Sequence, residues 1–416
     1  MTAAKGWRVR RRAVCKIASS RRFLLVAAVA GTLLLLTLLG NARGLGHRRR
    51  QRQQLALLAG QAAVSHAPLR RSLVVVTAVN FAFRHYVLNL ICSLQRVSSL
   101  SALNVLVFSL DARVHRFVKR HGLRSVLLAQ GAASDGEEEA VFGSARFNLL
   151  SKRKLHAVKQ VLDVGVDVLF SDADVVWCRG GFDAVLQLVA ERVGYADMFV
   201  QTAWPRSVLN SGFYYVASNS RTRALFDALL RFPQSSENDQ VIFNRVLCAS
   251  KYGGQLVFDN NATAERLPSG RIKPSACKWN GVRAELLDSR LYPTGGQLWS
   301  GRKLFHWSRD TIVHMCDSAA VRILHNNCIL SFGKLARFVV KGLWYVRGDY
   351  AHSQLVAREE EEDAADGDDS SPYADLATST GLHAVCGPPA LPTDLMRKRC
   401  GRAKCGDDAL LHPHST

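Results

Sequence analysis

Two aspartates, Asp172 and Asp174, stand directly after an apolar run in the segment VLFSDADVVWCRG. The residues VLF before the pair have the pattern of a buried strand, and the residues VVW after it are again apolar. Two carboxylates at this spacing, in a turn that leaves a strand, can hold a hard divalent cation that also binds a diphosphate. Solvated acidic turns are the structural alternative, but the apolar residues on both sides favour a site for Mn²⁺ or Mg²⁺.

The same segment also fits a phosphatase of the haloacid-dehalogenase type, in which Asp172 would be the nucleophile that accepts the phosphoryl group. That chemistry needs a later acidic pair at the end of another apolar strand. The later pairs are Asp368 with Asp369 and Asp407 with Asp408, and neither follows an apolar run. The phosphatase is therefore the weaker enzymatic alternative.

The elements that must position the two aspartates are short apolar runs separated by longer amphipathic stretches. The runs are LVVVTAV (73–79), NVLVFSL (104–110), SVLLA (125–129) and VDVLFSDADVVW (166–177). Residues 146–162 have the pattern of a basic amphipathic helix that leads into the last of these runs. The alternation predicts an α/β fold with an open, mostly parallel sheet flanked by helices, in which ligands bind beyond the carboxyl ends of the strands.

Five ordered sequence blocks resemble the nucleotide-diphospho-sugar transferases grouped as glycosyltransferase family 77, over about residues 74–344. The blocks are VTAVNFAFRHYVLNLICSL, SDADVVW, QTAWPRSVLNSGFYYVASNSRT, NDQVIFNRVL and HNNCILSFGKLARFVVKGLW. The resemblance implies a GT-A-type fold, a nucleotide diphosphate sugar as donor, and retention of configuration at the anomeric carbon. UDP-sugars are the expected donors, and a glycan or glycoprotein hydroxyl is the expected acceptor.

The resemblance also implies metal ligands: Asp172, Asp174 and, far along the chain, His325. A neutral imidazole can join two carboxylates on Mn²⁺, and His325 follows the apolar run VRIL. A histidine satisfied by nearby backbone is the structural alternative, and His314 is a rival ligand. Lys334 follows in the same block, where it would pair with the diphosphate or be a solvated helix lysine.

Several residues resemble donor-binding positions of the family. They are Thr77, Asn80, Arg84, Asp111 and Lys154. The first three follow the first predicted strand, and Asp111 follows the second, where a uracil or ribose contact is usual. Thr77 and Asn80 also fit the start of a helix as capping residues.

Two later motifs complete the predicted site. In Asn210-Ser211-Gly212, a residue without a side chain would allow a donor sugar to approach the backbone, although a tight turn is the alternative. The resemblance places Asp239 and Gln240 beside the transferred sugar, as catalytic-site groups. Asp239 could instead be a helix N-cap, with Asn238 as competitor for that position.

The resemblance favours a front-side mechanism in which the leaving phosphate accepts the proton of the acceptor hydroxyl. Such a route requires positioning and electrostatic stabilisation, and no nucleophile–base pair. Double displacement through Asp239 is the alternative. A third class, a catalytically silent sugar-binding protein of the same fold, would be favoured by loss of a metal ligand, but both aspartates are present.

The N-terminus has the pattern of a signal anchor. The 17 residues from Phe23 to Leu39 are uncharged, with eight basic residues before them and five soon after them. This length and charge bias predict a single-pass type II anchor with a cytosolic N-terminus, in a Golgi membrane. A cleaved signal peptide is the alternative.

The charge distribution excludes a nucleic-acid-binding function. The formal net charge is +21, but residues 1–52 hold 13 Lys or Arg and no acidic residue, which leaves +8 for the rest. The predicted organisation is a basic cytosolic tail, an anchor, a stem, a transferase domain, and an acidic disordered segment with a cysteine-containing tail. Their bounds are 1–22, 23–40, 41–70, 71–350 and 351–416.

A lumenal position has two further consequences. Nine of the ten cysteines follow the anchor, so disulfides are expected, although their pairing does not follow from the sequence. Asn261, in the triplet Asn-Ala-Thr, is the predicted N-glycosylation site.

Overall fold

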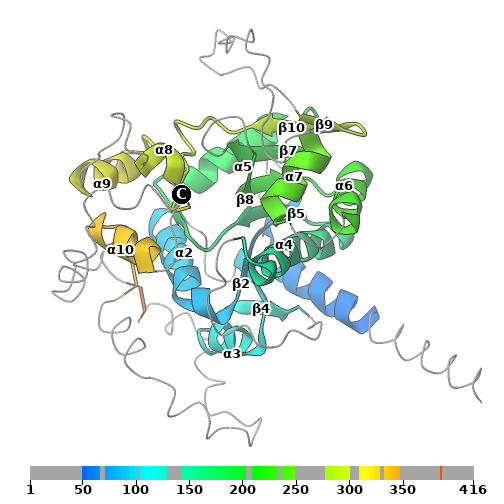
Figure 1. Cartoon of the computed structure of the whole chain (residues 1–416), viewed down its shortest axis with the longest axis horizontal. Helices are drawn as coiled ribbons and strands as arrows, with labels where there is room; N and C mark the ends of the chain where they lie inside the picture. Colours follow the sequence, from blue (N-terminus) through cyan, green and yellow to red (C-terminus); the bar gives the residue numbers. More distant parts are fainter. Residues whose placement is uncertain are drawn as a thin grey trace, which may run out of the picture. The chain divides into compact units, whose positions relative to one another are not determined.

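The computed structural model describes residues 49–65, 71–98, 100, 104–128, 143–192, 194–202, 209–232, 237–248, 277–299, 309–327, 332–346 and 385–386. The chain divides into two units, Met1–Gln54 and Leu55–Thr416. In the first unit only residues 49–54 are described, and they are helical. Every strand and helix labelled in Figure 1 belongs to the second unit.

The second unit is built on a central sheet, which has nine strands within the described residues. The strands are β1 (Val64–Ser65), β2 (Ser72–Val79), β3 (Val105–Ser109), β4 (Arg124–Leu127), β5 (Asp167–Ser171), β7 (Met198–Thr202), β8 (Leu209–Val216), β9 (Cys277–Trp279) and β10 (Val282–Leu286). Their order is β4-β3-β2-β5-β8-β7-β10-β9, and β1 pairs with β2. All but β1, β8 and β9 run in one direction. The predicted α/β fold with a mostly parallel sheet is thus confirmed.

The predicted apolar runs correspond to the strands on this sheet. The runs at 73–79, 104–110 and 125–129 become β2, β3 and β4. The run at 166–177 is divided into two strands, β5 and β6 (Val175–Trp177). The two aspartates lie between these strands, and β6 leaves the central sheet to pair with β11 (Ile323–His325).

Helices cover both faces of the sheet. They are η1 (Phe81–Phe83), α2 (Arg84–Val97), α3 (Ala112–Arg120), α4 (Ala145–Asp163), α5 (Gly181–Arg192), α6 (Ser220–Arg231), α7 (Asp239–Cys248), α8 (Gly295–Trp299), α9 (Arg309–Asp317) and α10 (Phe332–Val340). The helices α4, α6 and α7 contact one another and lie side by side in Figure 1. The predicted basic helix at 146–162 is confirmed as α4.

The side chains of β2 point alternately to the two faces of the sheet, as those of any strand do. The core is therefore divided into two layers. Val74 and Val76 pack in one apolar cluster with Leu155 of α4 and Phe226 of α6. Val75 belongs to the other cluster, which includes residues of α2, α5, α9 and α10. Both faces of the central sheet are therefore buried, as a parallel sheet requires.

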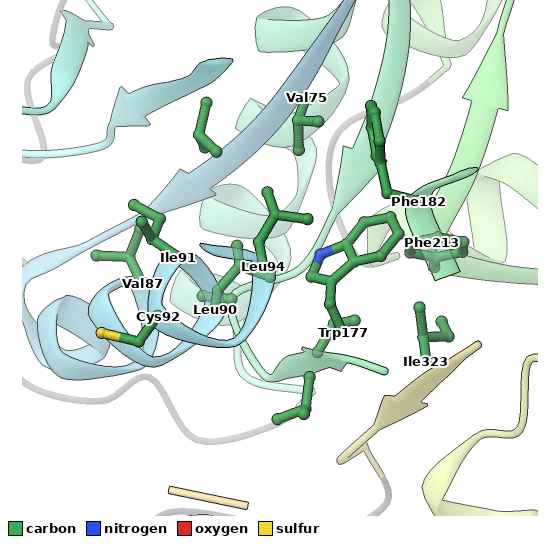
Figure 2. Packing of buried hydrophobic residues seen from close by; sticks show 14 of the residues in the cluster. Val75, Val87, Leu90, Ile91, Cys92, Leu94, Trp177, Phe182, Phe213 and Ile323 are labelled. Atoms are coloured by element: carbon green, nitrogen blue, oxygen red, sulfur yellow. The ribbon is translucent and has the colours of Figure 1, made fainter. Parts of the chain in front are cut away.

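Trp177 is the centre of the packing that holds β6 in place. Its side chain is fully buried, and its ring meets Phe213 edge-on at 5.4 Å and Phe182 at 5.9 Å between centroids. Figure 2 shows these rings together with Leu94 and Ile323, which come from different elements. Such edge-to-face contacts add to the apolar area that an aromatic residue buries. The turn that carries the two aspartates is therefore anchored on a rigid core.

Two disulfides join distant parts of the chain. Cys178, next to Trp177, is bonded to Cys316 at the end of α9, and Cys92 of α2 is bonded to Cys386. Cys386 also forms an antiparallel bridge with Val346. Residues 385–386 fall in the tail predicted after residue 350, and they are tied covalently to the sheet-and-helix unit.

Three predictions lie outside the described residues: the anchor at 23–40, the acidic segment and the sequon at Asn261. Within the part that the structure describes, no helix has both the length and the apolar character of a membrane span.

Candidate metal and nucleotide-sugar site

The aspartate turn begins where β5 ends. The backbone N–H of Asp172 donates to the carbonyl of Gly212 on β8 at 2.6 Å, and the carbonyl of Asp174 accepts from the N–H of Asn326 at 2.9 Å. The turn is closed by a bond of 3.3 Å from the N–H of Val175 to the carbonyl of Asp172. Both carboxylates thus extend from backbone that is fixed on two sides.

His325 reaches the aspartates through strand pairing. The antiparallel register of β11 with β6 sets His325 opposite Val175, the residue after Asp174. Its Nε2 lies 3.4 Å from Oδ1 of Asp174. One ligand atom each from Asp172, Asp174 and His325 can be chosen so that all lie within 4.8 Å of one another.

The rival histidine is not part of this group. His314 lies on α9, and its side chain is exposed to solvent. The difference arises from strand register, since only His325 ends the strand that pairs with β6.

Gln201 on β7 is a site residue that the sequence analysis missed. Its side chain is fully buried, and its Oε1 lies 2.8 Å from Nδ1 of His325. A polar residue inside the otherwise apolar run MFVQT was the available signal, because buried polar groups need specific partners.

Two lysines compensate the charge of the carboxylates. Lys334 donates to Oδ2 of Asp174 at 2.7 Å. Lys154, from α4, contacts Oδ1 of Asp172 at 3.1 Å and Oδ2 of Asp239 at 2.8 Å. Each ammonium group is largely buried, with 15–16% of the side chain exposed. The site is therefore a dense charge cluster, with three carboxylates and two ammonium groups.

Burial and these neighbours shift the pKa of several groups in opposite directions. Burial raises the pKa of Asp172, although Lys154 opposes the shift. Burial also disfavours the charged form of Asp174, but Lys334 and His325 outweigh it and hold the pKa well below its usual range. For Lys154, burial is outweighed by Asp172 and Asp239, so its pKa is raised. Asp174 is therefore ionised at neutral pH and available to a cation.

Asp239 is the first residue of α7, and the capping function belongs to its neighbour. Oδ1 of Asn238 accepts from the N–H of Val241 at 3.0 Å, which is the geometry of an N-cap. The N–H of Asp239 donates to Oγ of Ser151 at 3.1 Å, and its carboxylate faces Lys154. The structure thus assigns the cap to Asn238 and leaves the carboxylate of Asp239 in the charge cluster.

Gln240 follows on the same helix with a half-buried side chain. Its carbonyl accepts from Nδ2 of Asn244 at 2.8 Å. Asn244 also makes two bonds to the backbone of Leu209, of 2.8 and 2.9 Å, which tie α7 to β8.

The motif Asn210-Ser211-Gly212 lies on β8, with all three residues buried. Oδ1 of Asn210 accepts from the N–H of Gly212 at 2.7 Å. A Cβ atom on Gly212 would lie 2.5 Å from Oδ2 of Asp172 and 2.5 Å from Cε1 of His325. The missing side chain therefore makes room for Asp172 and His325 themselves, and the structure does not require the approach of a sugar to explain it.

Three predicted donor-binding residues gather around Phe81. Asp111 accepts from the N–H of Phe81 and from that of Val114, both at 2.8 Å, and so caps α3. The guanidinium carbon of Arg84 lies 4.1 Å from the centroid of the Phe81 ring. Asn80 precedes Phe81, and its side chain makes no capping bond to η1.

This group adjoins the charge cluster through η1. Nζ of Lys334 lies 5.3 Å from the ring centroid of Phe83, at the other end of η1 from Phe81. Thr77 lies inside β2 and is fully buried, and its hydroxyl has no hydrogen-bond partner among the described residues. Asp111 and Arg84 thus lie at the Phe81 end of η1, and Lys334 of the charge cluster lies at its Phe83 end.

The residue types at the centre fit a divalent cation. Two carboxylates and one imidazole are a donor set that suits Mn²⁺ and related ions. With a proton on Nδ1 for the bond to Gln201, Nε2 of His325 can direct a lone pair to the space beside Asp174. The convergence of acceptor atoms, together with the room left by Gly212, is the arrangement that a cation requires.

Comparison with known proteins identifies relatives. The family model described as nucleotide-diphospho-sugar transferase matches residues 101–338. A β-arabinofuranosyltransferase (RAY1) of Arabidopsis thaliana is 29% identical over 281 residues, which cover 65% of this chain and 47% of that protein. A UDP-galactose:fucoside α-3-galactosyltransferase of Dictyostelium discoideum is 23% identical over 303 residues, which cover 66% of this chain and 43% of that protein.

A third relative is covered over more of its length. UDP-D-xylose:L-fucose α-1,3-D-xylosyltransferase 3 of Arabidopsis thaliana is 30% identical over 290 residues, covering 68% of this chain and 69% of that protein. The chain spans slightly less than half the length of the first two relatives.

Proposed function

Because this chain belongs to the nucleotide-diphospho-sugar transferase family, we propose that it is a metal-dependent GT-A-type glycosyltransferase. It transfers a sugar from a nucleotide diphosphate sugar to a hydroxyl group of a glycan or glycoprotein. Asp172, Asp174 and His325 hold the divalent cation, Mn²⁺ or Mg²⁺.

The convergence of these three residues is the observation that carries the proposal. They come from the end of β5, the start of β6 and the end of β11, which are up to about 150 residues apart in sequence. When bound there, a divalent cation neutralises the negative charge that develops on the leaving diphosphate.

Lys334 is the residue that supports the leaving group from the protein side. Its ammonium group lies 2.7 Å from Asp174, next to the proposed ligand atoms, where it can also meet a phosphate oxygen as a point charge. Arg84 and Asp111, beside Phe81 at the other end of η1, hold the nucleoside end of the donor.

Asp239 acts on the sugar through charge and not as a nucleophile. Its carboxylate is paired with Lys154, which lowers the electron density available for attack on the anomeric carbon. It is suited to bind sugar hydroxyls or to stabilise positive charge at the anomeric carbon. Transfer then proceeds with retention, and the leaving phosphate accepts the proton of the acceptor hydroxyl.

The names of the relatives support a UDP-sugar as donor. Two of these names include UDP-galactose and UDP-D-xylose as donors and fucose or a fucoside as the acceptor. For this chain we propose a UDP-sugar of the pentose or hexose class. The same family membership favours a transferase over the phosphatase considered from the sequence.

We place the catalytic unit in the Golgi lumen, behind an N-terminal type II anchor. The uncharged apolar run Phe23–Leu39 with its basic flanks supports the anchor. The disulfides Cys92–Cys386 and Cys178–Cys316 support an oxidising compartment, because such bonds are rare in the cytosol.

A donor-hydrolysis screen tests the proposal. The purified full chain is incubated with a panel of UDP- and GDP-sugars, with Mn²⁺ or with a chelator, and nucleoside diphosphate, free sugar and inorganic phosphate are measured separately. We expect metal-dependent release of nucleoside diphosphate and sugar from at least one donor, and loss of this activity in Asp174→Asn.

Each alternative predicts a different result. A phosphatase releases inorganic phosphate and depends on Asp172 as nucleophile. A silent sugar-binding protein binds a donor without any release. Full activity of Asp174→Asn under chelation would remove the metal from the mechanism.

A further inference from the structure

We propose that Gln201 is a positioning residue: it fixes the tautomer and ring orientation of His325, and thereby sets the affinity of the site for Mn²⁺. The inference rests on the metal site of the proposed function. It concerns a residue that does not itself contact the cation.

The hydrogen bonds of Gln201 determine which way its amide group points. Its Nε2 donates to the carbonyl of Tyr292 at 3.0 Å and to that of Pro293 at 3.2 Å. A flipped amide would turn its oxygen against two carbonyl oxygens, and all three groups are acceptors. Oε1 of Gln201 must therefore face His325.

This orientation decides the position of the proton on the imidazole. Oε1 can only accept, so Nδ1 of His325, at 2.8 Å, must donate. In the neutral ring Nε2 then has no proton and offers its lone pair on the side of Asp174, 3.4 Å away. The other tautomer would direct an N–H bond at the position of the cation.

The same contacts hold the ring in place relative to the backbone. The carbonyl of Pro293, which accepts from Gln201, also accepts from the backbone N–H of His325 at 3.3 Å. Thr294 forms a parallel bridge with His325. One fully buried side chain on β7 thus links the segment 292–294 and the end of β11 to the central sheet.

A purely structural function is the competing explanation, since Gln201 satisfies two buried carbonyl groups. Two substitutions separate the explanations. Gln201→Met removes both the donors and the acceptor. Gln201→Glu keeps an acceptor for Nδ1 but lacks the amide N–H groups, so it disturbs the contacts to Tyr292 and Pro293 while it preserves the tautomer.

Mn²⁺ binding is measured on the full chain in detergent by electron paramagnetic resonance of the free ion, and melting is measured without metal. Loss of such an outer contact typically weakens metal binding by about 10- to 100-fold. We expect this loss in Gln201→Met, and near-wild-type binding in Gln201→Glu, even if both variants melt earlier. Gln187→Met is the matched control, because Gln187 lies exposed on α5 and pairs only locally with Glu191 at 3.0 Å.

The tautomer is read independently of any metal. Long-range nitrogen–proton correlation spectra of the ¹⁵N-histidine-labelled chain are recorded near pH 8, above the ordinary histidine pKa of about 6.5. His325 is assigned by the signal that disappears in His325→Asn. We expect a protonated Nδ1 in the wild type and in Gln201→Glu, and loss of this preference in Gln201→Met.

Three results would overturn the proposal: an unprotonated Nδ1 in the wild type, unchanged Mn²⁺ affinity in Gln201→Met, or equal weakening in both Gln201 variants. Failure of the proposed function has a different signature. In that case Asp174→Asn leaves Mn²⁺ binding unchanged, while the spectra still report the tautomer of His325.

Discussion

Substituting Gly212 by alanine should remove the metal site while leaving the fold nearly intact. The new Cβ would lie 2.5 Å from Oδ2 of Asp172 and 2.5 Å from Cε1 of His325. Non-bonded carbon atoms approach to about 3.5–4.0 Å, so both of these contacts must lengthen by about 1 Å. Gly212 does not have a positive φ, so backbone strain adds nothing to this effect.

The structure indicates which group moves. The ring of His325 is held by Gln201 and by strand pairing, so the backbone at Gly212 must shift away from it. Oδ2 is the tip of the Asp172 side chain, a quarter of which is exposed, and its contact to Nζ of Lys154 is long, at 3.3 Å. Asp172 should therefore swing away. Metal–ligand distances tolerate only about 0.2 Å, so a shift of this size takes Asp172 out of the ligand set.

We expect Gly212→Ala to weaken Mn²⁺ binding by at least about tenfold. The loss of folding stability should fall within the about 1–3 kcal/mol typical of overpacking, because the tip of Asp172 can move but the ring of His325 is held. Free Mn²⁺ is measured by electron paramagnetic resonance during titration of the full chain, and stability is measured by urea unfolding. Gly60→Ala is the control, since a Cβ there meets nothing within 4 Å.

Wild-type Mn²⁺ affinity in Gly212→Ala would refute the assigned geometry. A large loss of stability with retained binding would show that the crowding at Gly212 is structural and does not concern the metal ligands.

Other substitutions test the charge cluster and the acid stability. Asp239→Asn removes the charge that faces Lys154 and should lower transfer by about 10²- to 10³-fold with little change in melting. Asn238→Ala should do the reverse, costing about 1 kcal/mol of stability with turnover preserved, because Asn238 is the cap; equal loss of rate in both variants would contradict this assignment. Burial disfavours the charged form of Asp197, but Arg221 and the backbone N–H of Arg283 outweigh it and lower the pKa of Asp197. The contribution of Asp197 to stability is therefore present above the unfolded pKa of about 3.9 and is lost as pH falls through the folded value. Urea unfolding of Asp197→Asn should therefore show a weaker dependence of stability on pH below about pH 4 than the wild type, and an unchanged slope would show that other groups govern acid unfolding.

Much of the fold is encoded locally, which is why the sequence predicted it. The apolar runs that became β2, β3 and β5 are continuous, as strands buried on both faces require, and the run that became β4 forms a partly exposed edge strand. The position of Asp172 and Asp174 at the end of β5 follows from the same local pattern. The metal chemistry could be inferred because carboxylates at the end of such a strand lie where ligands bind in α/β sheets.

The choice between His325 and His314 depended on a long-range contact. Both histidines occur in plausible local settings, and the choice is made by the register of β11 against β6, which lie about 150 residues apart. No local propensity specifies a pairing over that distance, so the sequence left both candidates open. The division of roles between Asn238 and Asp239 was undecided for a similar reason, since it depends on Ser151 and Lys154 of α4.

The sequence by itself thus determined the strands β2 to β5, the aspartate pair and the types of residue that can bind a cation. Only the tertiary structure assigned Gln201 to His325, joined Cys92 to Cys386, and showed that Gly212 makes room for the carboxylate of Asp172. These features are contacts between segments that are far apart in the chain. They form because burial of the core brings the segments together, and the pattern within each segment does not specify its partner.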